Sequence, residues 1–194
     1  MYEVILITGA AASGKSTLSR ELAKLDNFAV FEYGDVLFQR STVKHPGLTY
    51  ADTRSHPEIF IDPEDISGTD EALQQFIVVH RDTQHVVIDS HAVSKENYGF
   101  RIEPFGPGQL QRATFSRIIF LHCDPRVIEA RTSAYPEGLP SLNFNESELY
   151  QNLQCSVAIN YSTILGIPIH FLDSALDSGV VLSQFLSLIG SKSH

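Results

Sequence analysis

One short segment near the start of the chain restricts the possible folds more than any other feature. Residues 9–16 read Gly-Ala-Ala-Ala-Ser-Gly-Lys-Ser and fit the pattern G-x-x-x-x-G-K-[ST] in full. The apolar run Val4–Ile7 precedes this segment, and leucines at positions 18, 22 and 25 follow it with helical spacing. The segment is therefore predicted to join a buried strand to a helix, which is the setting in which this pattern forms a phosphate-binding loop.

The chemistry of such a loop assigns a role to each part of it. Its glycines let successive backbone N–H groups turn inward around phosphate oxygens, and the helix N-terminus adds positive potential. The Lys15 ammonium is predicted to reach the β and γ phosphates, and the Ser16 hydroxyl to bind Mg²⁺. We therefore expect ATP or GTP with Mg²⁺ to bind at Gly9, Ala10, Ala11, Ala12, Ser13, Gly14, Lys15, Ser16 and Thr17.

A carboxylate that could complete the metal site follows another predicted strand. Val86-Val87-Ile88 are three strand-forming residues, and Asp89 comes directly after them. In a parallel sheet this position lies at the carboxyl edge, where ligands bind, so Asp89 is predicted to bind Mg²⁺ together with Ser16. His91 follows two residues later, and the sequence allows it either an acceptor-binding role or a structural hydrogen bond within the loop.

Apolar runs and helical spacings alternate along the rest of the chain. They predict an α/β, three-layer P-loop NTPase fold, with a five-stranded parallel sheet covered by helices on both faces. The predicted strands are 4–7, 28–31, 86–88, 116–121 and 167–172. After the first helix, further helices are expected at 71–81, 125–131, 147–165 and 180–189. Prolines and acidic residues predict an irregular excursion with short helices at about 41–70, and Pro136, Gly138 and Pro140 predict a loop at about 132–145.

Composition bounds the class of protein. With 194 residues, 43% of them hydrophobic and 19% charged, the chain is expected to form one globular domain over 1–194. A net charge of −9 does not favour nucleic-acid binding, because a polyanion is repelled. Cys123 and Cys155 are predicted to be reduced thiols. Since no leader peptide or membrane-spanning run is evident, a cytoplasmic protein is expected.

Several further motifs resemble one group of P-loop enzymes, the archaeal-type adenylate kinases and the related nuclear adenylate kinases within the nucleoside monophosphate kinases. The most specific is the Tyr-Gly-Asp turn in Glu32–Leu37, which follows the second predicted strand. The other similar segments are Val87–Ala92, Tyr98–Phe100, Asp124-Pro125 with Arg131 further along, Ala158–Tyr161 and Leu165–Pro168.

The resemblance implies roles for residues beyond the phosphate-binding loop. It implies a Mg²⁺-dependent phosphotransferase with Lys15, Asp35, Asp89 and Arg131 as catalytic residues. It also implies an acceptor-binding excursion at about 41–70 and a lid at about 132–145. The residues it places on the acceptor side are Asp35, Arg40, Arg54, His91 and Arg101.

Two departures from that group keep several functions open. The lid segment Thr132–Asn145 contains no Arg or Lys, and the excursion is acidic. The first hypothesis is a kinase that transfers the γ-phosphoryl group to a nucleoside monophosphate, which needs no general base. The second is a kinase that phosphorylates a hydroxyl of a nucleoside, sugar or other metabolite, with Asp35 as the base. The third is a slow ATPase switch or assembly factor that acts through a protein partner.

Overall fold

The computed structural model describes residues 2–55, 57–134 and 141–190 of the chain. Its elements follow one another as β1 (Val4–Thr8), α1 (Lys15–Leu22), β2 (Phe28–Glu32), α2 (Tyr33–Lys44), α3 (Tyr50–Ser55), α4 (Pro57–Phe60), α5 (Pro63–His80), β3 (His85–Asp89), β4 (Val93–Glu96), β5 (Gly99–Ile102), α6 (Pro107–Ala113), β6 (Arg117–His122), α7 (Pro125–Ala134), α8 (Phe144–Leu165), β7 (Ile169–Asp173) and α9 (Ser178–Gly190).

Five parallel strands form the central sheet, in the order β2-β3-β1-β6-β7. The middle strands β1, β3 and β6 are almost wholly apolar, because both of their faces are covered. The order reverses at β1, which lies between β3 and β6, so the carboxyl ends of these three strands meet beside the loop that follows β1. Ligands bind at this position in open parallel sheets.

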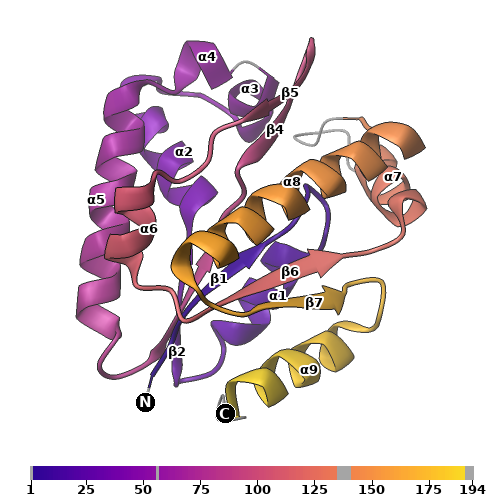
Figure 1. Cartoon of the computed structure of the whole chain (residues 1–194). Helices are drawn as coiled ribbons and strands as arrows, with labels where there is room; N and C mark the ends of the chain where they lie inside the picture. Colours follow the sequence, from indigo (N-terminus) through magenta and orange to yellow (C-terminus); the bar gives the residue numbers. More distant parts are fainter. Residues whose placement is uncertain (1, 56, 135–140, 191–194) are drawn as a thin grey trace.

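Helices cover the sheet in two layers (Figure 1). On one face, α5, α6 and α8 contribute Leu73, Ile77, Leu110, Ala158 and Tyr161 to an apolar cluster with strand side chains. On the other face, α1 and α9 contribute a second cluster, whose helical members are Leu18, Leu22, Val181 and Phe185. The predicted three-layer α/β P-loop fold, with a five-stranded parallel sheet, is therefore confirmed.

The predicted excursion at about 41–70 is more helical than expected. Helix α2 runs to Lys44, and α5 begins at Pro63, eight residues before the start predicted from its apolar spacing. Asp62 explains this early start, because its side chain accepts a hydrogen bond from the Asp65 N–H at 2.9 Å, and its own N–H donates to the Asp65 carboxylate at 3.2 Å. The described residues between α2 and α5 include the short helices α3 and α4.

Three elements between β3 and β6 were not predicted. β4 and β5 pair as an antiparallel hairpin, and α6 follows them. The hairpin lies against the N-terminal half of α8 (Figure 1), where Lys95 pairs with Glu146 at 3.0 Å and the Tyr150 hydroxyl donates to the Val93 carbonyl at 2.7 Å. Of the predicted lid at about 132–145, residues 135–140 lie outside the described residues. α7 continues to Ala134, and α8 begins at Phe144.

Among the described helices, none has the length and apolar character needed to cross a membrane.

Candidate active site

The segment after β1 forms a tight loop around the N-terminus of α1. Gly9 and Gly14 have φ values of 155° and 91°, a conformation that side chains disfavour. A side chain at Gly9 would also come within 2.5 Å of the Leu121 carbonyl oxygen, so this position also lacks the space for one. The Lys15 ammonium donates to the Gly9 and Ala10 carbonyls, at 2.9 Å each. These hydrogen bonds hold the Lys15 ammonium against the loop that is predicted to bind the phosphates.

A cavity of about 540 Å³ opens beside this loop, within the usual range for small-ligand pockets. Residues 12–18 form one wall. The opposite wall comes from Arg131 of α7, from Ser174 and Leu176 in the loop after β7, and from Ser178 and Val181 in the first turn of α9. Sequence reasoning missed the last four of these residues. The position of Ser174 directly after the last strand of a parallel sheet was the only available signal.

Arg131 joins the two walls of the cavity. Its guanidinium donates to the Ala12 carbonyl and to the Ser174 carbonyl, at 2.9 Å each. Ser174 is itself fixed by its N–H and its hydroxyl, which both donate to the His122 carbonyl at 2.8 and 3.0 Å. The predicted catalytic residue Arg131 therefore lies beside the phosphate-binding loop, and its charge is held on the cavity side of α7.

Asp89 ends β3 and is buried beneath α1. Its carboxylate accepts a hydrogen bond from the Ser19 hydroxyl at 3.2 Å. Burial raises the pKa of this carboxyl, and the Asp35 carboxylate raises it further, while Lys15 and the Ser19 hydrogen bond act in the opposite direction. Because the net shift is upward, Lys15 and Ser19 compensate this buried carboxylate only in part, and such a group is well suited to a cation that arrives with a ligand.

The oxygen ligands available beside the phosphate-binding loop fit Mg²⁺ bound together with a nucleotide better than a metal held by protein side chains alone. Among the described residues, no three His, Cys, Asp or Glu side chains converge on a possible metal position. Mg²⁺ commonly takes one or two protein oxygens and completes its shell with water and substrate phosphates. Asp89, together with the exposed Ser16 hydroxyl at the start of α1, provides this kind of set.

Glu32 is a second carboxylate at this edge, and sequence reasoning did not select it. It ends β2 and lies opposite Asp89 in the strand pairing. Burial is the main cause of its raised pKa, and repulsion from Asp35 and Asp89 adds to it, while Arg20 opposes the shift. The rule that pointed to Asp89, an acid at the carboxyl end of a parallel strand, would also have found Glu32.

The structure places Asp35 in the first turn of α2, just after Glu32. Its side chain is exposed and accepts a hydrogen bond from the Tyr50 hydroxyl of α3 at 2.5 Å. Asp35 contributes to the raised pKa of both Asp89 and Glu32. The three carboxylates therefore lie within electrostatic reach of one another, on the side of the phosphate-binding loop that faces the excursion.

The basic side chains expected on the acceptor side come from three different elements, β5, α2 and α3. Arg101 pairs with Glu103 at 2.9 Å and with Glu96 at 3.4 Å in the hairpin. Arg40 is exposed, and its guanidinium fills the space that a side chain at Gly68 would need. Arg54 belongs to α3, but its side chain lies outside the described part of the structure.

His91 is exposed in the loop that follows Asp89. A buried residue of α8, Gln154, holds this loop: its side-chain oxygen accepts from the Ala92 and Val93 N–H groups at 3.0 Å each, and its amide donates to the Thr8 hydroxyl at 2.8 Å. Gln154 thus ties the end of β1 to the loop between β3 and β4. No local sequence signal marks such a residue.

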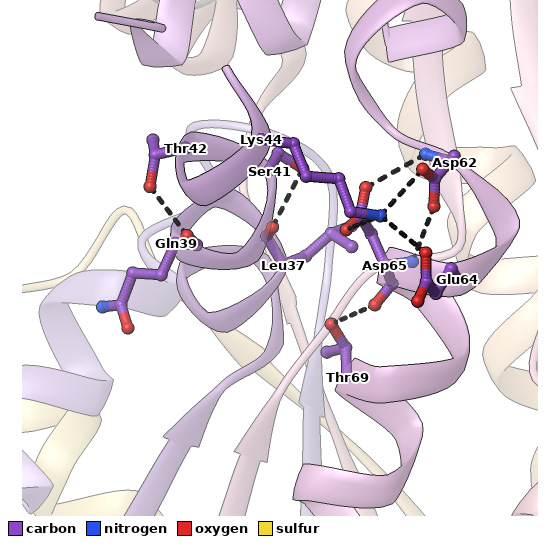
Figure 2. A network of polar contacts seen from close by, with 9 residues as sticks. All are labelled: Leu37, Gln39, Ser41, Thr42, Lys44, Asp62, Glu64, Asp65 and Thr69. Atoms are coloured by element: carbon purple, nitrogen blue, oxygen red, sulfur yellow. Dashed lines mark hydrogen bonds and ion pairs between the residues drawn. The ribbon is translucent and has the colours of Figure 1, made fainter. Parts of the chain in front are cut away.

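A cation of the excursion is also neutralised. Figure 2 shows Lys44, at the end of α2, reaching three acids at the start of α5. Its ammonium lies 2.8 Å from Asp62, 2.9 Å from Asp65 and 3.1 Å from Glu64. These ion pairs fasten α2 to α5, and the Asp62 hydrogen bond is the main cause of the raised pKa of Lys44. Lys44 therefore brings no uncompensated positive charge to the acceptor side.

Comparison with solved structures agrees with the fold of this chain. The solved structures similar over nearly the whole chain include a candidate kinase from Chloroflexus aurantiacus J-10-fl, with a TM-score of 0.59, 15% identity and 96% and 97% of the two chains covered. The tunicamycin resistance protein of Deinococcus radiodurans has a TM-score of 0.53 and 16% identity, and the match covers 99% of this chain and 98% of that one. A sugar kinase from Janibacter sp. HTCC2649 has a TM-score of 0.52 and 12% identity, and the match covers 97% of this chain and 95% of that one. These identities establish the fold alone.

Sequence comparison adds one curated relative and one family. A cytidylate kinase from Pelodictyon phaeoclathratiforme is 33% identical over 93 residues, which is 48% of this chain and 36% of that protein. The comparisons support a P-loop kinase-like group, and the finer resemblance to archaeal-type adenylate kinases stays a prediction. The model of a family described as "AAA domain" matches residues 8–138, roughly two thirds of the chain and including the whole phosphate-binding loop. The chain therefore belongs to this AAA domain family of P-loop proteins.

Proposed function

We propose that this protein is a Mg²⁺-dependent kinase that transfers the γ-phosphoryl group of ATP or GTP to a hydroxyl group of a small neutral acceptor. The observation that carries the proposal is the group of three carboxylates, Glu32, Asp35 and Asp89, beside the phosphate-binding loop. A hydroxyl must lose a proton to attack phosphorus, and a carboxylate can accept it. Carboxylates also accept hydrogen bonds from the other hydroxyls of such a molecule.

The charges on the acceptor side support the same conclusion. An anionic acceptor needs cations beside it, and arginines are the usual partners of phosphate. Here Lys44 is engaged by three acids and Arg101 by two. The carboxylates Glu32 and Asp35 would in addition repel a second phosphate. A neutral acceptor avoids this cost.

The proposed mechanism uses residues that the fold brings to one edge of the sheet. Lys15 and Arg131 would bind the phosphates of the donor and neutralise charge that develops during transfer. Ser16 and Asp89 would hold Mg²⁺, which when bound supplies further charge neutralisation. Asp35 would accept the proton of the attacking hydroxyl, and Glu32 would orient the acceptor.

A nucleoside monophosphate remains a second candidate acceptor. The similarity to a cytidylate kinase supports it, as does the exposed Arg40, which could move from its place beside Gly68 to bind a phosphate. In that reaction the attacking phosphate oxygen is already ionised, so Asp35 would bind the acceptor and would not act as a base. The two functions therefore assign opposite importance to Asp35 and Arg40.

An acceptor screen followed by two substitutions distinguishes them. ADP release is measured with ATP and Mg²⁺ in the presence of sugars, polyols, nucleosides or nucleoside monophosphates. With the best acceptor, Asp35→Asn should lower kcat by about 10² to 10⁴, the usual contribution of a general base, and Arg40→Gln should have little effect. Asp26→Asn, an exposed acid at a turn away from the site, is the matched control.

Other results would contradict the proposal. If only monophosphates are phosphorylated, with a severe loss for Arg40→Gln and only a KM effect for Asp35→Asn, the monophosphate function is correct. If ADP release is slow and independent of every acceptor, the slow ATPase switch is favoured.

A further inference from the structure

An aromatic pair lies directly against the proposed base. Asp35 and Phe38 are three residues apart on α2 and so share one side of the helix. Tyr50, the first residue of α3, stacks on Phe38 with ring centroids 3.8 Å apart and ring planes at 19°. From this position its hydroxyl donates to the Asp35 Oδ1 atom at 2.5 Å. No motif in the sequence singled out Tyr50 or Phe38.

The hydrogen bond affects how Asp35 can act. An exposed carboxylate at the start of a helix can rotate about its side-chain bonds, and each wrong orientation reduces the fraction of molecules ready to react. A carboxylate has two oxygens and several lone-pair directions, so a donor on Oδ1 leaves Oδ2 able to accept a proton. The stacked Phe38 ring in turn limits where the Tyr50 ring can lie.

We propose that Tyr50 is a positioning residue for Asp35, which it orients so that Oδ2 faces the acceptor hydroxyl, with the Phe38 ring holding Tyr50 in place. This inference rests on the proposed function, because it requires Asp35 to act as a base. If Tyr50 has this role, its effect on the rate requires the Asp35 carboxylate, whereas a contact that only stabilises the fold would act without it. In a blocking role, by contrast, the Tyr50 hydroxyl would occupy the place of the acceptor.

The test is a double-mutant cycle in the full-length chain with Tyr50→Phe, Asp35→Asn and the double variant, assayed with the best neutral acceptor. Tyr50→Phe keeps the ring on Phe38 and removes only the hydroxyl. We expect kcat to fall by about tenfold, the order of one hydrogen bond to a charged group, and the KM of the acceptor to change by less than about twofold. In the Asp35→Asn background the same substitution should have no further effect on kcat.

A second variant changes the ring that holds Tyr50 and leaves Tyr50 itself intact. Phe38→Leu leaves the Tyr50 hydroxyl present and removes the stacked ring, so it should also lower kcat and again have no effect in the Asp35→Asn background. Thermal melts of all variants identify any that fail to fold. Tyr98→Phe, which removes the hydroxyl of a tyrosine exposed in the β4–β5 turn, serves as the matched control.

Each outcome decides one question. If Tyr50→Phe lowers kcat equally with and without the Asp35 carboxylate, Tyr50 acts elsewhere and the inference is wrong. If Tyr50→Phe leaves kcat unchanged and lowers the acceptor KM, the hydroxyl blocks the site, and the inference is again wrong. If Asp35→Asn alone leaves kcat unaffected, the proposed function itself has failed.

Discussion

Asp89→Asn should make the ligand-free protein more stable although it impairs the proposed metal site. Asp89 is 7% exposed and accepts a side-chain hydrogen bond from Ser19. Asparagine has nearly the same size and keeps an oxygen for Ser19, but it carries no charge that must leave water. A buried polar group that lacks a partner costs about 1–3 kcal/mol, and a charged group costs more. The attraction to Lys15 offsets part of this cost, so we expect a net gain of about 1 kcal/mol.

The gain should depend on pH in a defined direction. The pKa of Asp89 is raised above its ordinary value of 3.8, so the folded protein holds this proton more tightly than the unfolded chain. The stability that Asp89 contributes in its protonated form is present at low pH and is lost as pH rises through the ordinary value toward the raised one. The advantage of Asp89→Asn should therefore be smallest in acid and largest at neutral pH and above.

Thermal melts without metal or nucleotide, at pH 5 and pH 8, measure this effect. A gain of about 1 kcal/mol corresponds to a Tm increase of about 2–4 °C for a chain of this size. Asp82→Asn, at an exposed turn, should change Tm little and is the control. With ATP and Mg²⁺ added, the wild-type protein should gain more stability than the variant. An Asp89→Asn protein that melts lower than wild type by the same amount at both pH values would refute this account.

Three further substitutions test the donor and acceptor sides. Lys15→Ala should lower kcat by about two to three powers of ten, the order for one preorganised donor, and near-normal turnover would contradict its assignment. Lys24→Ala, at an exposed lysine two residues after the end of α1, is the control. Arg131→Gln should weaken ATP binding by roughly tenfold in calorimetry, because the charge beside the phosphates is lost together with the hydrogen bonds that the guanidinium donates to the Ala12 and Ser174 carbonyls. Arg126→Gln, at an exposed arginine of the same helix, should leave ATP binding unchanged. Glu32→Gln should raise the acceptor KM severalfold and leave kcat within about twofold in steady-state assays; a large kcat loss would instead make Glu32 the base.

The sequence by itself determined the parts of this protein that depend on local pattern. The strand–loop–helix unit around Gly9–Thr17 could be predicted, because apolar runs, helical spacing and glycine positions are all encoded within about twenty residues. The parallel five-stranded sheet followed, because alternating strands and helices can pack in few other ways. The position of Asp89 at the sheet edge could be predicted for the same reason.

Only the tertiary structure decided which side chains meet. The ion pairs of Lys44 join residues that no spacing rule connects. Together with the ion pairs of Arg101, they change the charge of the acceptor side from mixed to largely negative. Contacts between Tyr50 and Asp35, and between Arg131 and Ser174, also depend on how separate elements pack. Secondary structure reflects short-range backbone and side-chain preferences, but the electrostatics of a site depend on distances through space, which chain separation does not determine.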